Sequence, residues 1–369
     1  MHNYLTSIVG QPRVVDALKK FIDSEQIPHA LIFTGTKNVG QHFAAKQFIK
    51  ELLHTKTNEK KFISHIDKLE DPIVKYVIPL PRGKNETPDD SPLNKLTLSE
   101  IENLKNEINK KTENHYYEIF LEGANSIKIS SIRDIKKNLT INYDDLPYRL
   151  VLIEDAHLMG EESQNALLKS LEEPPKGVIF ILITDNHNLL LSTIKSRCWK
   201  VPFSPLIDSD MENILIHNFN IDVTFAKKMI PFAEGSIHKV FDLLNNGFDK
   251  LLDTSIDILR YAIGRKYNTA IKLFNSTIEG NPKILFQIII QLIINWIIDV
   301  QKARIGTDKI HCVGYEDTIE KFNLKFNYVR LDNLVFELTN LTKTLNYNIN
   351  LNLLVLNVIF NLSTLSKRS

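Results

Sequence analysis

Short apolar runs rich in β-branched residues alternate with amphipathic stretches through the N-terminal half of the chain. The run at 178–183, Val-Ile-Phe-Ile-Leu-Ile, is apolar throughout, which is typical of a strand covered on both faces of a parallel sheet. Such runs predict strands at 31–34, 117–121, 149–153, 178–184 and 199–203. Helical spacing lies between them, for instance at 11–24, 43–53 and 161–172. The alternation predicts an α/β domain over 1–206, a parallel sheet with helices on both faces and right-handed crossovers.

Residues 55–113 interrupt this order, because Lys, Asn, Glu and Pro replace the apolar runs and turn-forming residues crowd positions 79–92. We interpret the segment as a partly mobile insertion that carries one charged helix near 98–111. After residue 205 no strand pattern remains, and amphipathic helices continue to 366 with breaks near Gly247 and Gly280. This pattern predicts a small helical lid at 207–250 and an all-helical domain at 251–369.

One apolar helix, 284–298, is shorter than the about 20 residues that a bilayer requires. Polar residues recur in it every four positions, at Gln287, Gln291, Asn295 and Asp299, and draw a stripe along an otherwise apolar surface. We therefore expect a packed helix of a helical bundle and no membrane partner. The N-terminus lacks the basic and apolar regions of a signal peptide.

Composition narrows the possible functions. The chain has 45 basic and 44 acidic residues, so its overall charge does not favour nucleic acid or membrane binding. Its two cysteines, Cys198 and Cys312, exclude a disulfide framework and a four-cysteine zinc module within the chain, and they indicate a reducing compartment such as the cytoplasm.

The strand predicted at 31–34 leads into a glycine-bounded loop that resembles a phosphate-binding loop. Gly35 and Gly40 stand where such a loop has its glycines, but Gln41 takes the place of the lysine that reaches the β- and γ-phosphates. His42 takes the place of the hydroxyl residue that holds Mg²⁺. Because a charge-assisted contact contributes about 1.5–3 kcal/mol, these replacements predict that the chain binds ATP poorly.

Two carboxylates, Glu154 and Asp155, follow the strand predicted at 149–153. In P-loop ATPases an Asp at the first position orients the Mg²⁺ shell and a Glu at the second activates water. The reversed order displaces both sets of oxygens by about one ångström, enough to reduce a rate greatly. The pair could equally lie in a solvated turn with no chemical role.

Further candidates follow the later strands. Ser196, Arg197 and Cys198 precede the last strand, where Arg197 is either a surface charge or an arginine finger that stabilises a transferring phosphoryl group. We interpret Cys198 as a small buried thiol. Thr184 could sense a γ-phosphate or simply end its strand. His238 stands where a nucleotide-sensing arginine is expected, but it carries no permanent charge at neutral pH.

Several motifs together identify a family resemblance. They are Gln11-Pro with His29-Ala-Leu-Ile-Phe, Glu154-Asp-Ala-His-Leu-Met, Asn165-Ala-Leu-Leu-Lys-Ser-Leu-Glu-Glu-Pro-Pro and Thr193-Ile-Lys-Ser-Arg-Cys. They resemble bacterial clamp-loader subunits of the AAA+ class over residues 10–205. The altered loop is similar to that of the non-hydrolysing subunits rather than the ATP-hydrolysing gamma/tau type.

The resemblance implies an AAA+ α/β domain, a helical lid and a helical collar in a ring that loads the sliding clamp onto primed DNA. It implies gamma/tau and delta subunits, the clamp and primer-template DNA as partners, and Arg197 as a finger that reaches a neighbour's ATP. Zinc is not expected, since the four cysteines that bind it in many relatives are missing, and His29, His42 and His157 lack metal-ligand spacing. We expect no catalytic turnover by this chain.

Two alternatives remain open at this point. The chain could be an active AAA+ ATPase of the gamma/tau type that tolerates Gln41. It could also hold ADP or ATP statically, through the backbone N–H groups at the start of the helix that follows Gly40.

Overall fold

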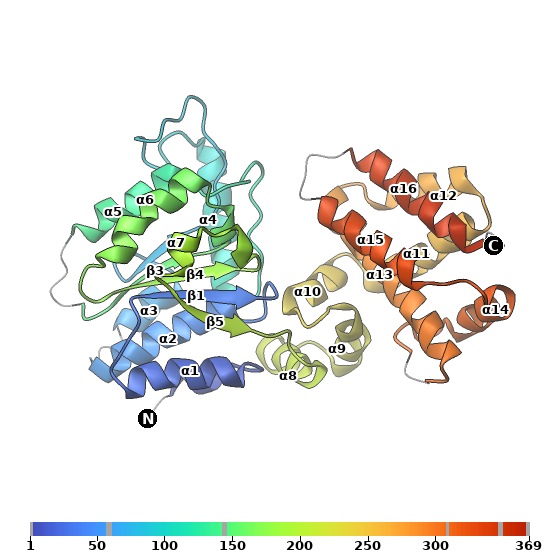
Figure 1. Ribbon diagram of the computed structural model, residues 1–369, viewed down its shortest axis with the longest axis horizontal. Coiled ribbons are helices and arrows are strands. Elements are labelled where there is room, and N and C mark those ends of the chain that lie inside the picture. Colours follow the sequence, from blue (N-terminus) through green and yellow to red (C-terminus); the bar gives the residue numbers. More distant parts are fainter. Residues whose placement is uncertain (1–2, 57–60, 142–145, 308–309, 346–349, 367–369) are drawn as a thin grey trace. The chain divides into compact units, whose positions relative to one another are not determined.

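A computed structural model describes residues 3–56, 61–141, 146–307, 310–345 and 350–366 of the chain (Figure 1). Their contacts form two compact units. Unit 1 comprises Met1–Phe219 with Gly235–His238, and unit 2 comprises Asn220–Glu234 with Lys239–Ser369. The predicted insertion and helical domain include residues 57–60, 308–309, 346–349 and 367–369, which lie outside the described residues.

Unit 1 is built on a five-stranded sheet whose strands all run parallel, in the order β2-β3-β4-β1-β5. The strands are β1 (Ala30–Gly35), β2 (Val74–Val77), β3 (Arg149–Ile153), β4 (Val178–Thr184) and β5 (Trp199–Phe203). The register places Gly35, the last residue of β1, opposite Phe203 of β5. The carboxyl ends of β1, β3 and β4 therefore meet at one edge of the sheet, where open α/β sheets bind ligands.

Helices cover both faces of this sheet, which explains the continuously apolar strands. The helices of unit 1 are α1 (Pro12–Asp23), α2 (Gln41–Lys56), α3 (Lys61–Asp67), α4 (Leu98–Glu113), α5 (Ile129–Leu139), α6 (Glu161–Glu172), α7 (Ser192–Lys195) and α8 (Asp208–Phe219). Figure 1 shows α5, α6 and α7 on one face and α1, α2 and α3 on the other. The predicted sheet with helices on both faces is confirmed.

The strand predicted at 117–121 is wrong, because these residues pair with no strand. Their backbone is satisfied by side chains of α4 instead. The carbonyl of Tyr117 accepts a hydrogen bond from Lys111 Nζ at 2.7 Å, and the N–H of Phe120 donates to Glu107 Oε2 at 2.9 Å. A backbone that is satisfied in this way has no need of a strand partner.

The sheet contains one strand that the sequence pattern did not predict, β2, and it lies inside the segment that was expected to be an insertion. β2 pairs with β3 and forms one edge of the sheet, so residues 74–77 belong to the sheet and the expectation is wrong there. The charged helix near 98–111 is confirmed as α4, which begins with a capping box between Thr97 and Glu100. Between β2 and α4, the buried carboxylate of Glu86 lies 2.7 Å from the buried ammonium of Lys128, which precedes α5.

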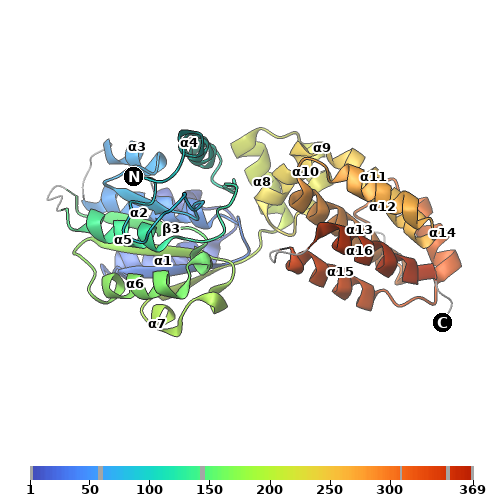
Figure 2. The same ribbon diagram turned by 90° about the horizontal axis from the view of Figure 1, so that it is seen from above.

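Unit 2 is entirely helical in the described residues. Its helices are α9 (Val223–Met229), α10 (Ile237–Asn245), α11 (Phe248–Ile263), α12 (Tyr267–Thr277), α13 (Pro282–Arg304), α14 (Glu316–Phe326), α15 (Asp332–Thr344) and α16 (Leu351–Ser363). Figures 1 and 2 show α11, α12, α13 and α16 side by side in both views. α13 is long and apolar enough to span a membrane, but 72% of its most apolar window is buried within the unit, as in a core helix.

The two units do not coincide with the predicted boundaries at 206 and 250. α8 belongs to unit 1, and so does the short segment Gly235–His238. This segment returns to the sheet domain because Gly235 accepts a hydrogen bond from the N–H of Leu206 at 3.0 Å and Ser236 donates to the carbonyl of Lys37 at 3.1 Å. The predicted lid is therefore divided between the units.

Candidate functional site

The loop from Gly35 to Gly40 joins β1 to α2 at the carboxyl edge of the sheet. Gly35 has a φ of +140°, and a Cβ there would lie 2.1 Å from the carbonyl oxygen of Phe203. Gly40 has a φ of +109°, which side-chain-bearing residues rarely adopt. The two glycines therefore allow the loop its bends at positive φ and its close approach to β5.

The side chain of Gln41 turns back onto this loop. Its Oε1 accepts the N–H of Val39 at 3.0 Å, and its Nε2 donates to the carbonyl of Thr36 at 2.5 Å. Gln41 is buried, with 3% of its surface exposed. A loop N–H that phosphate would use is thus already bound to a neutral amide of the same loop.

His42 lies in a buried cluster around Glu154. Glu154 Oε1 is 3.1 Å from His42 Nδ1 and 3.0 Å from Lys111 Nζ, and Glu154 Oε2 accepts from the hydroxyl of Tyr76. Burial raises the pKa of Glu154, but the charge of Lys111 and the contacts of His42 and Tyr76 outweigh it and hold that pKa well below its usual range. Burial lowers the pKa of His42 to about 4, so the ring is neutral at pH 7. Lys111 therefore supplies the cation that balances Glu154.

Asp155 faces a second cation at the loop. Lys37 Nζ lies 3.1 Å from Asp155 Oδ1 and 2.8 Å from Glu118 Oε1. Burial disfavours the charged form of Lys37, but Glu118 and Asp155 outweigh it and raise its pKa. Asn38 Nδ2 also donates to Glu118 Oε2 at 3.2 Å. The two carboxylates that follow β3 thus point to different partners, and neither is left open toward the loop.

Residues 114–121, which we call the strap, lie over the loop. The ring of Tyr116 is within 3.8 Å of the point where a Cβ of Gly40 would stand, and Tyr116 is 5% exposed. The ring of His115 stacks on that of His42 with centroids 6.2 Å apart. The strap therefore covers the start of α2 as well as the loop itself.

The two sensor-like residues also have partners within the chain. Thr184 Oγ1 lies 3.2 Å from His157 Nδ1 and accepts the N–H of Asn186 at 3.0 Å. His238 Nε2 lies 3.5 Å from Glu118 Oε2. Of the two, His238 is brought to the loop, because the segment Gly235–His238 belongs to unit 1.

Arg197 stands apart from the loop, just after α7. Its Nη2 lies 2.6 Å from Glu172 Oε1, and its Nη1 donates to the carbonyl of Thr193 at 2.9 Å and to Ser196 Oγ at 3.4 Å. About a third of the side chain, 34%, is exposed. Cys198 packs against the sheet's core, and burial raises the pKa of its thiol to about 12, in keeping with a structural role.

An AAA+ fold implies a bound nucleotide with Mg²⁺, and the residues at the loop do not fit it. The lysine and hydroxyl positions hold Gln41 and His42, whose side chains bond to the protein itself. Glu154, Asp155 and Glu118 would bring three carboxylates close to a polyphosphate of the same sign. A triphosphate could enter only after the strap and its carboxylate had moved.

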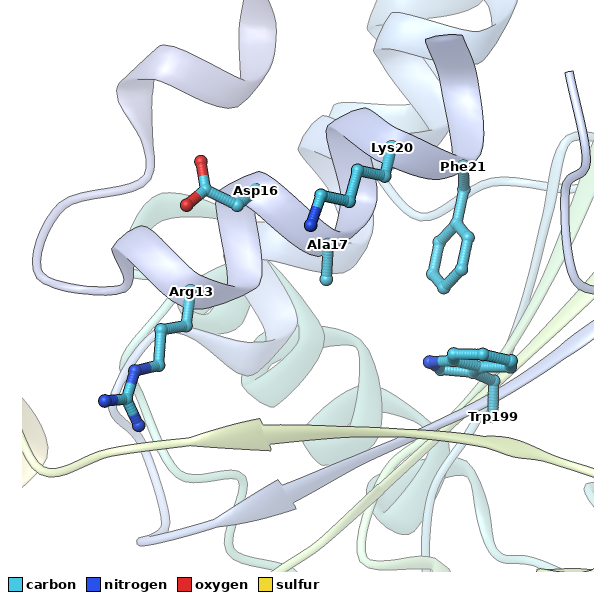
Figure 3. A pocket seen from close by; sticks show the side chains of 6 residues that line it. All are labelled: Arg13, Asp16, Ala17, Lys20, Phe21 and Trp199. Atoms are coloured by element: carbon cyan, nitrogen blue, oxygen red, sulfur yellow. The ribbon is translucent and has the colours of Figure 1, made fainter. Parts of the chain in front are cut away.

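A hollow occurs elsewhere on unit 1, at the opposite end of β5 from the loop (Figure 3). Its lining residues are Arg13, Asp16, Ala17, Lys20, Phe21 and Trp199. Trp199 is 59% exposed and packs edge-on against Phe21, with ring centroids 5.5 Å apart. Two aromatic rings and scattered charges of both signs provide no arrangement for catalysis.

Sequence reasoning missed several residues of the site. They are Lys37, Tyr76, Lys111, Tyr116 and Glu118. Lys37 lies in the glycine-bounded loop at a position to which the loop pattern assigns no role, and the other four lie in stretches without a motif. Contacts such as that between Lys37 and Glu118 join positions 81 apart in the chain. The one available signal was the uneven mixture of aromatic and charged residues over 115–118, which does not suit a strand in the middle of a sheet.

Comparisons with known proteins place the chain's similarities among subunits of DNA polymerase III. Residues 10–207 match the family described as DNA polymerase III, delta subunit. The gamma subunit of DNA polymerase III from Buchnera aphidicola subsp. Schizaphis graminum is 28% identical over 244 residues, 65% of this chain and 57% of that protein. The tau/gamma subunit of Haemophilus influenzae is 26% identical over 244 residues, 64% of this chain and 30% of that protein.

A solved structure, a DNA polymerase III gamma subunit-related protein from Thermotoga maritima, covers 95% of this chain and 99% of its own, with 14% identity and a TM-score of 0.41. The chain spans less than two thirds of the length of the two curated relatives. The family match, by contrast, extends over more than half of the chain and contains the loop, both carboxylates and Arg197.

Proposed function

Because the chain belongs to the DNA polymerase III delta subunit family, we propose that it is a clamp-loader subunit of the delta-prime type that does not hydrolyse ATP. Its relatives are named as gamma and tau subunits of the same polymerase. In this role it works in the cytoplasm beside gamma/tau and delta subunits, and the assembled loader places the sliding clamp on primer-template DNA.

One observation carries the proposal: the groups that would bind ATP are engaged within the chain. Gln41 occupies the N–H of Val39, and Glu118 occupies Lys37 and Asn38. Replacing these contacts by a nucleotide would break the neutral hydrogen bond of Gln41 and the two charge-assisted bonds to Glu118, the latter contributing about 1.5–3 kcal/mol each. The internal contacts therefore support a subunit that keeps the ATPase scaffold without its turnover.

The partly exposed side chain of Arg197 supports a contribution in trans. An arginine supplied to a neighbour's site stabilises the charge on the transferring phosphoryl group, with an effect of about 10³–10⁵ on rate. Arg197 is held by Glu172 and the carbonyl of Thr193, and part of it reaches the surface. Ser196 and Cys198 hold the turn around it, one through its hydroxyl and the other through burial against the core.

The purified chain tests the first half of this proposal. We expect no Mg-ATP turnover above background and no rise in melting temperature with ADP or ATP. As a matched control, Gln41→Lys restores the charge at the loop but leaves the strap in place, so it should also remain inactive. Turnover by the wild-type chain would overturn the proposal.

The alternative function is that of an active or nucleotide-holding subunit of the gamma/tau type. The names of the two curated relatives favour it, since one is a gamma subunit and the other a tau/gamma subunit. It requires binding of ATP at the loop, so stabilisation by nucleotide without turnover would indicate a static site. Stabilisation with turnover would indicate an ATPase.

A further inference from the structure

The carboxylate of Glu118 lies against the loop, where it contacts three side chains from two other parts of unit 1. Glu118 Oε1 is 2.8 Å from Lys37 Nζ, and Glu118 Oε2 accepts from Asn38 Nδ2 at 3.2 Å. His238 Nε2 lies 3.5 Å from the same Oε2. A cation, an amide donor and an imidazole thus converge on one anionic group.

This arrangement has the chemistry of an anion site. Lys37 and Asn38 belong to the glycine-bounded loop, and His238 reaches Glu118 from the segment Gly235–His238 of the same unit. Ser236 also binds the loop, through the carbonyl of Lys37 at 3.1 Å. Like a phosphate, a carboxylate offers negative charge and acceptor oxygens, so Glu118 satisfies donors that would otherwise face an anion.

The strap is built to hold Glu118 in this position. On one side, Tyr116 is buried above Gly40. The carbonyl of Tyr117 accepts from Lys111, and the hydroxyl of Tyr117 donates to Glu107 at 2.8 Å. On the other side of Glu118, the N–H of Phe120 donates to Glu107 Oε2 at 2.9 Å. The residues before and after the carboxylate are therefore fixed, and its place over the loop is not the result of a free surface side chain.

We propose that Glu118 is an internal ligand that fills an anion subsite formed by Lys37, Asn38 and His238. The external ligand class that fits this subsite is phosphate, whether inorganic or at the end of a nucleotide. The inference deepens the proposed function, on which it rests: the loop retains its capacity for anions and uses it to bind the strap and the segment Gly235–His238 together.

Thermal unfolding of the full chain tests this inference, with inorganic phosphate as the probe and chloride at equal ionic strength as the reference. In the wild type the subsite is filled, so phosphate should give no specific stabilisation. Glu118→Gln removes the charge at nearly constant shape, and about 50 mM phosphate should then raise the melting temperature by about 3 °C or more relative to chloride.

Two variants make the test specific. Glu122→Gln removes an exposed carboxylate four positions further along and should behave as wild type. Lys37→Met combined with Glu118→Gln should lose the phosphate effect, because the cation of the subsite is gone. A phosphate effect of equal size in Glu118→Gln and Glu122→Gln would overturn the inference, as would its absence from a folded Glu118→Gln.

The wild type alone also tests the inference, whether or not the variants fold. A phosphate-specific rise in its melting temperature would show that the subsite is open and would overturn the inference. These outcomes are separate from the proposed function, which is tested by turnover and stabilisation of the wild-type chain with ATP and by the dependence of the loader on Arg197.

Discussion

Lys111 offers the most direct test of the charge balance beneath the loop. It extends from α4 into the core of the site, is 2% exposed, and lies 3.0 Å from Glu154 Oε1. It also donates to the carbonyl of Tyr117 at 2.7 Å. Among the described residues that contact Glu154, Lys111 alone carries a permanent charge at pH 7, because burial keeps His42 neutral.

Lys111→Met keeps the length of the side chain and removes its charge. Breaking a buried pair by removing one partner costs about 3–5 kcal/mol, since the remaining charge is left without compensation. The side chain of Glu154 is 14% exposed, so some water reaches it and we expect the lower end of this range, about 3 kcal/mol. The carbonyl of Tyr117 also loses its donor, which loosens the strap.

The neighbouring Lys110 provides a matched control. It is 56% exposed and pairs with Glu107 at 2.7 Å, an interaction that contributes at most about 1 kcal/mol at the surface. Urea unfolding followed by hydrogen exchange of β3 peptides would report on unit 1 separately from unit 2. Lys111→Met should lower the unfolding free energy far more than Lys110→Met. Adding Glu154→Gln to Lys111→Met should recover part of the loss. Equal effects of the two lysine variants would refute the reasoning.

Two further predictions concern the stacked imidazoles and the surroundings of the arginine. Burial lowers the pKa of His42 to about 4 and that of His115 to about 2, so the unfolded chain takes up these protons first and stability falls as the pH drops below about 6.5. Urea titrations should show wild type losing about 1.4 kcal/mol more than His115→Phe between about pH 7.5 and 5.5, and equal losses would contradict the assignment. Glu172→Gln should lower the DNA-stimulated ATPase of the loader up to about fivefold by releasing Arg197, whereas Glu173→Gln should not; equal rates in both variants would show that the pair does not position the guanidinium.

The fold was largely predictable because burial on both faces leaves a clear record in the sequence. Residues 178–183 are apolar without interruption, and β4 spans Val178–Thr184 as predicted. β2 was missed because its four residues, Val-Lys-Tyr-Val, place two polar or amphipathic side chains between buried ends and are too short for a periodic signal. The aromatic residues at 116–121 favour a strand by propensity, but side chains of α4 bind the backbone of this stretch and it pairs with no strand.

The sequence showed which phosphate-binding side chains are absent from the loop, but it did not show which other side chains fill the site. The absence of a lysine at Gln41 and of a hydroxyl at His42 follows directly from the loop pattern. That Gln41 binds its own loop depends on a side-chain rotamer, and that Lys111 and Glu118 fill the site depends on contacts between segments far apart in the sequence. Such contacts leave no local pattern.

We propose that this chain supplies Arg197 to the ATP of a neighbouring subunit and hydrolyses no ATP itself. The most direct measurement is the DNA- and clamp-stimulated ATPase of the reconstituted loader, with wild-type chain, Arg197→Ala and Lys195→Ala as a control from the same turn. We expect Arg197→Ala to lower the rate about 10-fold or more with assembly intact, a loss of about 1.4 kcal/mol or more of transition-state stabilisation, and Lys195→Ala to leave it unchanged. An unchanged rate in Arg197→Ala would contradict the proposal and leave the subunit a purely structural part of the loader.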